Sequence, residues 1–525
     1  MATNPDLLLK RFLHYGRETS LYQPGNRILN KYFEPNCITS VEALIADGRP
    51  ADAVVHIVKA YSDGYSAHSE ALVYALACCV RQKSNDALRQ NAYKAFKKVC
   101  KSVQNFFLFV KFSTELSSPT RGWGHGCRKV VIDWYVKQNP LELAENVTRY
   151  RGIYFWTHRD IIKLAHPKTE DVAMKAVLKY VMKGIKEARE EFGGNPLAQP
   201  VLTYLQAVED FKHSKEEEWA ARVVEQHKLC LEHVPPQFIK SKEVWAALIP
   251  NMPLPTLLRN LKRLGRLRFL RTNHPVMIRV VEALGNQAAI TEGSVHPAQV
   301  LIALRSYEQS GRLKYVDPNR ELKPLVQPNP KIIEALNTLL ESSFKSLVPT
   351  GLRYLVMVDT RSPLVTGHCW QCTSVPPLHA AALIALSLVK TERNVTVLAF
   401  GVGVPTAVPL SKTMTLVQAQ EKLREVPTTS VDFGLPFSWA TENKKEIDVF
   451  ICITDSQVRA GRLKAAEELK KYRESLNMPN TKFVVCGLTC PKFSIASEDD
   501  PGMLDIAGFD EQVPRVIEAF SRGAF

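Results

Sequence analysis

The sequence predicts an α + α/β protein, in which a long row of α-helices is followed by a doubly wound α/β domain. With 525 residues, the chain is too long to fold around a single hydrophobic core. Apolar residues recur at helical spacing up to about residue 345, whereas strands alternate with helices after Gly351. The charge divides at the same place: residues 1–350 hold 49 Lys and Arg against 34 Asp and Glu, and residues 351–525 hold 19 of each.

The first part contains successive amphipathic segments separated by Pro, Gly or Ser. No exact repeat period is visible, but many short helices with basic faces are typical of a curved helical solenoid. The segments that we predict to be helical are 84–101, 126–137, 157–166, 170–190, 200–211, 215–233, 255–269 and 297–310.

The second part has four β-rich segments with helical stretches between them. This alternation predicts a parallel sheet with helices on its faces, and it places the domains at 1–350 and 351–525. The predicted strands are 352–359, 394–401, 447–455 and 481–488, and the predicted helices are 377–390, 416–425 and 461–476.

Composition narrows the class of protein. The hydrophobic fraction of 45% is ordinary for globular proteins. The eleven cysteines are odd in number and scattered, which favours reduced thiols over a disulfide framework. The start shows no signal-peptide pattern, and no apolar run approaches the length of a membrane span. We therefore expect a protein of the cytoplasm, or of the nucleus, with no membrane partner.

The surplus positive charge is concentrated in two stretches. Residues 81–189 carry 22 basic and 9 acidic residues, and residues 251–281 carry seven basic residues and no acid. Such clustering predicts contact with a polyanion, and nucleic acid is the first candidate.

The segment 120–129 combines four basic residues with Trp123 and three glycines. Cations beside an aromatic ring suit phosphate contact and base stacking, and glycines let a backbone approach closely. A Gly-rich turn before a surface helix is the alternative interpretation. The basic residues are Arg121, His125, Arg128 and Lys129.

Two further helices have basic faces. In the helix 157–166, Thr157 is the expected N-cap, and Arg159, Lys163 and His166 share an outward side. In the helix 170–190, four lysines line one face, where they repel one another unless an anion binds. A single charged face is usually just solvated, but three in succession favour binding. The four lysines are Lys175, Lys179, Lys183 and Lys186.

The densest basic cluster follows Pro255. It surrounds four leucines at helical spacing, so a membrane-surface or targeting helix is one alternative. Together with the basic faces upstream, the cluster favours a nucleic-acid-binding surface. Its phosphate contacts would determine affinity but would not distinguish one base sequence from another. The cluster comprises Arg259, Lys262, Arg263, Arg266, Arg268 and Arg271.

Several motifs together resemble the telomerase–Ro–vault (TROVE) domain family of Ro ribonucleoproteins, over nearly the whole chain. No single motif is specific, but their combination is. They are Pro119-Thr-Arg-Gly-Trp-Gly124, Arg128-Lys129 with Asp133-Trp-Tyr135, Val147-Thr-Arg-Tyr150, Trp156-Thr-His-Arg-Asp160, Leu257-Leu-Arg-Asn-Leu261, His296-Pro with Leu301-Ile-Ala-Leu304, Val485-Cys-Gly487 and Gly502-Met-Leu-Asp505.

This resemblance implies a ring of HEAT-like helical repeats followed by a von Willebrand factor A-like domain. It also implies binding of small noncoding RNAs called Y RNAs, and of the single-stranded 3′ ends of misfolded RNAs, in noncoding RNA quality control. The family's Y RNA contacts map onto Arg149, which replaces a more usual lysine, and His166. The RNA-contacting residues that we predict are Arg121, His125, Arg128, Lys129, Arg149, Arg151, His158, Arg159, Lys163, His166, Lys175, Lys179, Lys183, Arg259, Lys262 and Arg263.

A von Willebrand A domain usually binds a divalent cation through Asp-x-Ser-x-Ser, a Thr and a second Asp, whose oxygens suit a hard metal ion. Asp359 and Asp455 remain here, but Arg361, Pro363 and Val431 stand at the other three positions. We therefore predict that no Mg²⁺ or Mn²⁺ binds in the usual way. A loop shift that brings in Thr360, Ser362 or Ser430 is the alternative.

Our more specific hypothesis is that the Arg361 guanidinium takes the place of the metal and pairs with Asp359 or Asp455. The alternative is that Arg361 points to solvent and the two acids are hydrated. His368-Cys369-Trp-Gln-Cys372 contains one Cys-x-x-Cys without a second pair, which is weak support for a zinc or redox site.

The sequence thus favours a non-catalytic RNA-binding protein, expected to be a monomer that binds small noncoding RNA and misfolded RNA ends. We find no nucleophile and neighbouring base at the spacing of a known catalytic motif. The alternative is a protein-interaction scaffold that uses its C-terminal domain and binds RNA secondarily. The lost metal ligands also suggest a diverged family member with a different RNA repertoire.

Overall fold

The computed structural model describes residues 4–25, 33, 37–118, 122–286, 288, 290, 295–309, 327–455 and 462–525. The chain divides into two compact units. We call residues Phe33–Met252 the helical unit, and residues Met1–Tyr32 together with Pro253–Phe525 the sheet unit. Each is described by itself.

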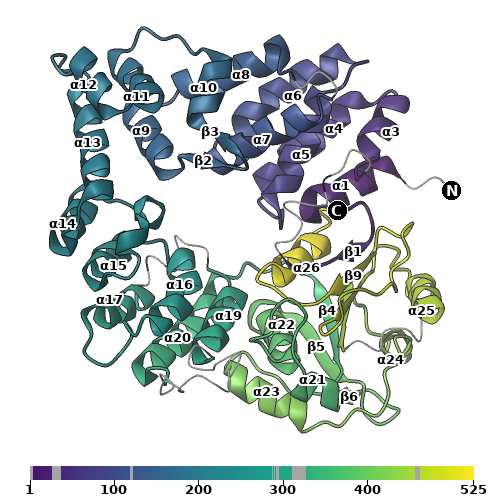
Figure 1. Cartoon of the computed structure of the whole chain (residues 1–525). Helices are drawn as coiled ribbons and strands as arrows, with labels where there is room; N and C mark the ends of the chain where they lie inside the picture. The colour runs from purple at the N-terminus through teal and green to yellow at the C-terminus, as the bar shows by residue number, and fades with distance from the viewer. Residues whose placement is uncertain are drawn as a thin grey trace, which may run out of the picture. The chain divides into compact units, whose positions relative to one another are not determined.

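In the helical unit, short helices stack along the chain (Figure 1). A helix commonly contacts the next but one, as α4 does α6, α6 does α8 and α8 does α10, which is typical of helical repeats. The helices are α3 (Ser40–Ala46), α4 (Pro50–Asp63), α5 (Ser69–Val80), α6 (Asp86–Val99), α7 (Val103–Glu115), α8 (Gly124–Val136), α9 (Pro140–Arg149), α10 (His158–Ala165), α11 (Val172–Lys183), α12 (Ile185–Phe192), α13 (Gln199–His213), α14 (Glu217–His227) and α15 (Lys242–Leu248).

Local sequence explains where these helices begin and end. The side chains of Thr157 and Asp171 cap α10 and α11, with the Asp160 and Met174 amides donating to them at 3.1 and 3.0 Å. The predicted single helix 170–190 is wrong, because Gly184 has a φ of 93° and separates α11 from α12. A short β-hairpin links α9 to α10, and its strands β2 (Gly152–Ile153) and β3 (Trp156–Thr157) have two residues each.

The sheet unit confirms the predicted helices followed by a doubly wound α/β domain. Its mostly parallel sheet has the order β1-β9-β8-β7-β4-β5-β6, and only β6 is antiparallel to its neighbour. The strands are β1 (Leu21–Tyr22), β4 (Arg353–Val358), β5 (Asn394–Ala399), β6 (Thr406–Ala407), β7 (Val449–Thr454), β8 (Lys482–Gly487) and β9 (Met503–Ala507).

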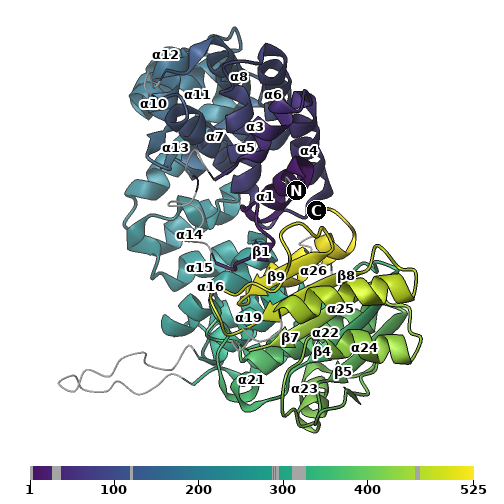
Figure 2. The ribbon, with the colours of Figure 1, turned by 90° about the vertical axis from the view of Figure 1, so that its right-hand side faces the viewer.

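Helices cover both faces of this sheet, as its buried strands require. In Figure 2, α24 and α25 lie in front of the sheet, while α22 packs on β4 and β5. The helices are α1 (Pro5–Tyr15), α16 (Leu254–Arg266), α17 (Pro275–Leu284), α19 (Pro297–Glu308), α20 (Pro330–Ser343), α21 (Ser362–Thr366), α22 (Pro377–Thr391), α23 (Leu416–Arg424), α24 (Leu435–Glu442), α25 (Arg462–Ser475) and α26 (Val513–Ser521).

The N-terminal segment also belongs to the sheet unit. β1 pairs in parallel with β9, the last strand in the sequence. The Tyr22 hydroxyl donates to the Asp510 carboxylate, and the buried Arg11 guanidinium donates to the Glu498 carbonyl at 2.8 Å. The strands predicted from the sequence do not include β1. Within the described ranges, no helix combines the length and the apolar composition that crossing a bilayer needs.

Candidate functional site

Exposed cations gather on neighbouring helices of the helical unit. α10 packs against both α8 and α11 (Figure 1). Ile161, Ile162 and Ala165 of α10 are buried, whereas its basic residues stand in solvent. Arg121 lies outside the described residues, so the structure says nothing of it. The exposed side chains on α8 and α10 are His125, Arg128, Lys129, Arg159, Lys163 and His166.

A cavity of about 800 Å³ brings three of the predicted cations together. Arg151 follows α9, Arg159 lies on α10 and Lys183 ends α11, yet all three line this one cavity. All three are exposed, and in the part of the chain that the structure describes none has an ion-pair partner. The cavity can therefore offer uncompensated positive charge to an anion.

Three acids also line the cavity, namely Asp160, Glu187 and Glu209, and each contacts a neighbouring side chain. Glu187 lies 4.0 Å from Lys179. Asp160 accepts a hydrogen bond from the Thr157 hydroxyl at 2.5 Å, and Glu209 accepts from Tyr180 at 2.5 Å and Lys212 at 2.9 Å. Burial favours a raised pKa of Glu209, but these hydrogen bonds outweigh it and leave the pKa below its usual value. Lys212 and His213, two adjacent basic residues at the end of α13, also line the cavity and are not among the predicted contacts.

The hairpin between α9 and α10 ends in a strained turn. Tyr154 and Phe155 have φ angles of 54° and 68°, the left-handed values of a type I′ turn, where Asn-Gly is preferred. This conformation costs a residue with a side chain about 1–2 kcal/mol. The Phe155 side chain is fully exposed, with a relative accessibility of 102%. Phe155 is not among the predicted contacts, since no local pattern in the sequence marks a strained aromatic turn.

The structure contradicts the prediction that His158 contacts RNA. Its side chain is only 1% exposed, its Nδ1 lies 2.7 Å from the Tyr135 hydroxyl, and its ring packs edge-on against Phe107. Burial lowers the pKa of His158 to about 3, so the imidazole is neutral near pH 7. The residue is part of the core of the helical unit and is not a surface cation.

The expected uncompensated lysine row on α11 is also wrong for two of its members. Lys175 pairs with Glu170 at 3.1 Å, and Lys179 pairs with Glu191 at 2.6 Å. The second pair forms because α12 brings its acidic side chains alongside α11. Lys183 keeps an exposed charge, so the row contributes to the cavity only at its end.

The two residues carried over from the family motif have different environments. Arg149 donates to Glu232 at 3.1 Å, and its guanidinium lies 5.1 Å from the centre of the Tyr150 ring. An anion would therefore compete with Glu232 for this arginine. His166 is exposed at the end of α10, with a left-handed φ of 54°.

The predicted cluster on α16 lies in the sheet unit. Arg259 and Arg263 are exposed, and Lys262 is half-buried. The amphipathic pattern is confirmed, because the leucines on the other side of α16 are buried. They are Leu257, Leu258, Leu261 and Leu264.

At the carboxyl end of β4, Arg361 lies between the two acids, as our hypothesis stated. Its Nη2 donates to Asp359 at 2.7 Å and to Asp455 at 3.1 Å, while its Nε donates to Asp359 at 3.0 Å. The Arg361 side chain is 17% exposed, and the two carboxylate side chains are 0% and 2% exposed. Hydrogen bonds to Asp359 raise the pKa of Arg361 above its usual value. A buried guanidinium thus balances two buried carboxylates.

These residues do not fit a divalent cation. Asp359 already accepts from the Arg361 amide at 2.9 Å, the Arg361 side chain and the Thr454 hydroxyl at 2.9 Å. Thr360, one of the alternative ligands, donates to the Val426 carbonyl at 2.5 Å. Val431 packs against the hydrophobic cluster of the sheet. A cation would have to displace a guanidinium and would find few oxygen ligands.

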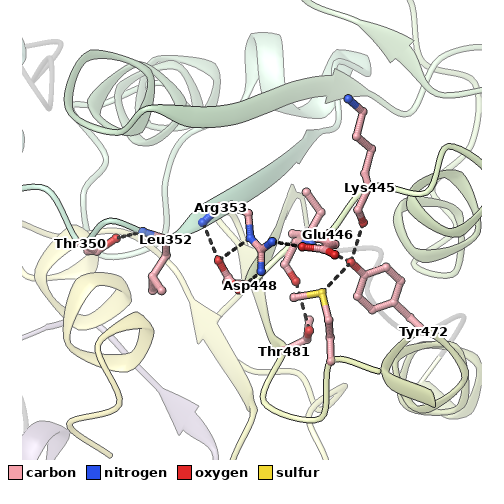
Figure 3. Close-up of polar contacts among 10 residues, drawn as sticks. Thr350, Leu352, Arg353, Lys445, Glu446, Asp448, Tyr472 and Thr481 are labelled. Carbon is pink, nitrogen blue, oxygen red and sulfur yellow. Dashed lines mark hydrogen bonds and ion pairs between the residues drawn. The ribbon is translucent and has the colours of Figure 1, made fainter. Parts of the chain in front are cut away.

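Arg353 at the opposite end of β4 provides a comparison. It donates to Asp448 at 2.8 Å through Nη2 and also pairs with Glu446 (Figure 3). Its side chain is 34% exposed, and Glu446 is largely exposed. This is an ion-pair network at the surface, unlike the buried one at Arg361.

The Cys-x-x-Cys segment does not form a recognisable metal centre. Cys369 and Cys372 are both buried, and burial raises the pKa of both thiols. Among the described residues, no group of three or more His, Cys, Asp or Glu side chains could hold a metal ion.

Comparisons with known proteins match both parts of the chain. The family model of the TROVE domain matches residues 48–337, and that of the Ro60 vWA domain matches residues 353–521. The chain is 27% identical to RNA-binding protein RO60 of Caenorhabditis elegans, over 86% of this chain and 78% of that protein. It is 29% identical to RNA-binding protein RO60 of Deinococcus radiodurans, over 85% and 80%. The crystal structure of the Deinococcus radiodurans RO (RSR) protein matches with a TM-score of 0.85 and 26% identity, covering 99% of this chain and 100% of that one.

Proposed function

The chain belongs to the TROVE domain family, and we propose that it binds RNA through its helical unit. The observation that carries this proposal is the cavity where Arg151, Arg159 and Lys183 converge without acidic partners among the described residues. Guanidinium and ammonium groups in a concave site suit phosphate groups. The two RO60 relatives are named RNA-binding proteins and not enzymes.

We propose further that the RNA is a small structured noncoding RNA of the Y type, or a misfolded noncoding RNA with a single-stranded 3′ end. The protein would act as a monomeric, non-catalytic component of small ribonucleoproteins in the cytoplasm or nucleus. Exposed cations on α8 and α10 would hold helical parts of the RNA by their phosphates. The altered residues around Arg361 suggest that its RNA repertoire differs from that of other members.

The proposal is tested by fluorescence anisotropy with a labelled stem–loop RNA that carries a single-stranded 3′ tail. We expect binding that weakens steeply between 50 and 200 mM salt, by roughly 10³-fold if six phosphates are contacted. The Arg151→Ala/Arg159→Ala/Lys183→Ala variant should bind at least ten-fold more weakly, on the order of the loss of one charge-assisted hydrogen bond. Lys422→Ala, which removes a cation already paired with Glu425, is the control. Equal binding by the triple variant would reject the cavity as the site.

Arg149 and His166 allow a separate test of the residues carried over from the family. Arg149→Ala with His166→Ala should reduce affinity and leave the melting temperature unchanged. Glu232→Gln should act in the opposite direction, because it removes the charge that competes for Arg149. If neither variant changes affinity, these residues are not the contact.

We also propose that the site at the carboxyl end of β4 binds no divalent cation. The support is the double pairing of Arg361 with Asp359 and Asp455. Titration of Mg²⁺ and Mn²⁺ should leave the melting temperature of the protein unchanged. A saturable rise that is absent in Asp359→Ala would overturn this proposal.

A further inference from the structure

The tip of the β2–β3 hairpin presents one aromatic ring to solvent. Phe155 has the largest exposed fraction among the exposed large apolar side chains of the described residues. It occupies the second position of a turn in which Tyr154 and Phe155 both have positive φ. Two consecutive side-chain-bearing residues with positive φ cost free energy that folding alone does not require, and such strain clusters at binding sites, which points to a role in binding.

The hairpin holds this ring in a fixed place. Trp156, the next residue, packs on the buried Trp123 with ring centres 5.8 Å apart. A Cβ on Gly152 would lie 2.7 Å from the Trp156 carbonyl oxygen, so the two strands meet closely there. Thr157, the last residue of β3, caps α10. Since both ends are anchored, Phe155 cannot easily fold back onto the protein.

Two arginines and one acid, Asp160, lie beside the hairpin. Arg151 precedes β2 and Arg159 lies in the first turn of α10, and both line the cavity described above. At about 3.3 Å per residue, the tip stands about 7 Å from the base of the hairpin. An apolar pocket of a protein partner would have to desolvate these arginines, whereas RNA satisfies both groups, with bases for the ring and phosphates for the guanidinium groups.

We infer that Phe155 stacks on an unpaired base of RNA whose phosphates are held by Arg151 and Arg159. This inference rests on the proposed RNA-binding function and assigns to Phe155 the contact with unpaired bases of the bound RNA. A base within a duplex is already stacked on both sides, so the ring gains nothing from double-stranded RNA. Stacking is tolerant of sequence, so no strong base preference is expected.

The test compares a labelled single-stranded ten-nucleotide RNA with a duplex of the same length, by anisotropy at fixed salt. Phe155→Ala should weaken single-strand binding by about ten-fold and leave duplex binding unchanged. Phe155→Trp should keep the wild-type affinity. Leu197→Ala, which removes another exposed apolar side chain of the helical unit, should have no effect.

Phe155→Leu separates stacking from a general apolar contact. If it binds the single strand like the wild type while Phe155→Ala does not, the ring is not stacking and the inference is overturned. It is also overturned if Phe155→Ala binds like the wild type, or if single-strand and duplex binding fall equally. If the wild-type protein binds neither RNA, the proposed function itself fails.

The strain in the turn provides an independent readout. Tyr154→Asn with Phe155→Gly gives the turn residues that positive φ favours. We expect its melting temperature to rise while its affinity for the single strand falls, because a strained functional position trades stability for binding. A higher melting temperature with unchanged affinity would show that the ring does not contact RNA.

Discussion

The cavity of the helical unit and the carboxyl end of β4 use positive charge in opposite ways. In the cavity, Arg151, Arg159 and Lys183 are exposed and lack an acidic partner among the described residues. At the end of β4, Arg361 is largely buried and bridges two carboxylates. The difference teaches that burial and pairing, and not the number of cations, distinguish a surface that can bind an anion from a charge that stabilises the fold.

The largest expected effect tests whether Arg361 is structural. Arg361→Ser leaves Asp359 and Asp455 as two buried, uncompensated carboxylates. We expect the free energy of unfolding, measured with urea, to fall by about 3–5 kcal/mol. Adding Asp359→Asn to this variant should recover part of the loss, because one buried charge is then removed. If the free energy of unfolding falls by less than about 1 kcal/mol, Arg361 contributes no more to stability than an ordinary surface arginine.

A second experiment compares paired with unpaired cations within the helical unit. Arg159→Ala/Lys163→Ala removes two exposed cations of α10, whereas Lys175→Ala/Lys179→Ala removes two that have acidic partners. We expect the first variant to weaken RNA binding about ten-fold or more, and the second to have a clearly smaller effect. The slope of affinity against salt should fall by about one for each phosphate contact that is lost. If the two variants weaken RNA binding equally, ion pairing does not decide which cations contact RNA.

A third experiment uses pH to show that His158 is buried and not a surface cation. Its pKa is lowered to about 3 by burial, whereas an unfolded chain has an ordinary histidine pKa near 6.5. Between these values the unfolded state binds the proton and the folded state does not, so stability falls as the pH decreases below about 6.5. The contribution is about 1.4 kcal/mol per pH unit. His158→Asn should reduce the slope by this amount between pH 4 and 6, and an unchanged slope would contradict the burial.

The smallest effect is expected at Arg353, the other arginine of β4 (Figure 3). Its network with Asp448 and Glu446 lies at the surface, where solvent and salt screen the charges. Arg353→Ala should lower the free energy of unfolding by at most about 1 kcal/mol, and the loss should shrink in high salt. A loss as large as that of Arg361→Ser would break the comparison between the two ends of the strand.

Much of the architecture could be predicted from the sequence, because periodicity and punctuation are local. Near Gly351 the chain changes from successive helices to strands that alternate with helices. The spacing of apolar residues along the sequence shows this change, because it depends only on residues close together in the chain. The ends of α11 at Gly184 and of α14 at Lys228 were not predicted, although a glycine such as Gly184 commonly ends a helix. β1 was not predicted either, since two residues carry no strand pattern until β9 is placed beside them.

The candidate site was predictable only in part. The predicted RNA-contacting residues include Arg151, Arg159 and Lys183, but they also include His158, which is buried. The sequence could not show that Lys179 pairs with α12, nor that Phe155 stands exposed on a strained turn. These properties depend on which side chains meet in space.

The sequence by itself determined the change from successive helices to alternating strands and helices near Gly351, the family motifs, and an arginine at a position where we had expected a metal ligand. Those follow from residue identity and spacing, which need no knowledge of distant contacts. Only the tertiary structure decided which cations remain unpaired, which histidine is buried and which two carboxylates Arg361 bridges. The reason is that burial and ion pairing are set by residues far apart in the chain, such as Asp359 and Asp455, that folding brings within a few ångströms.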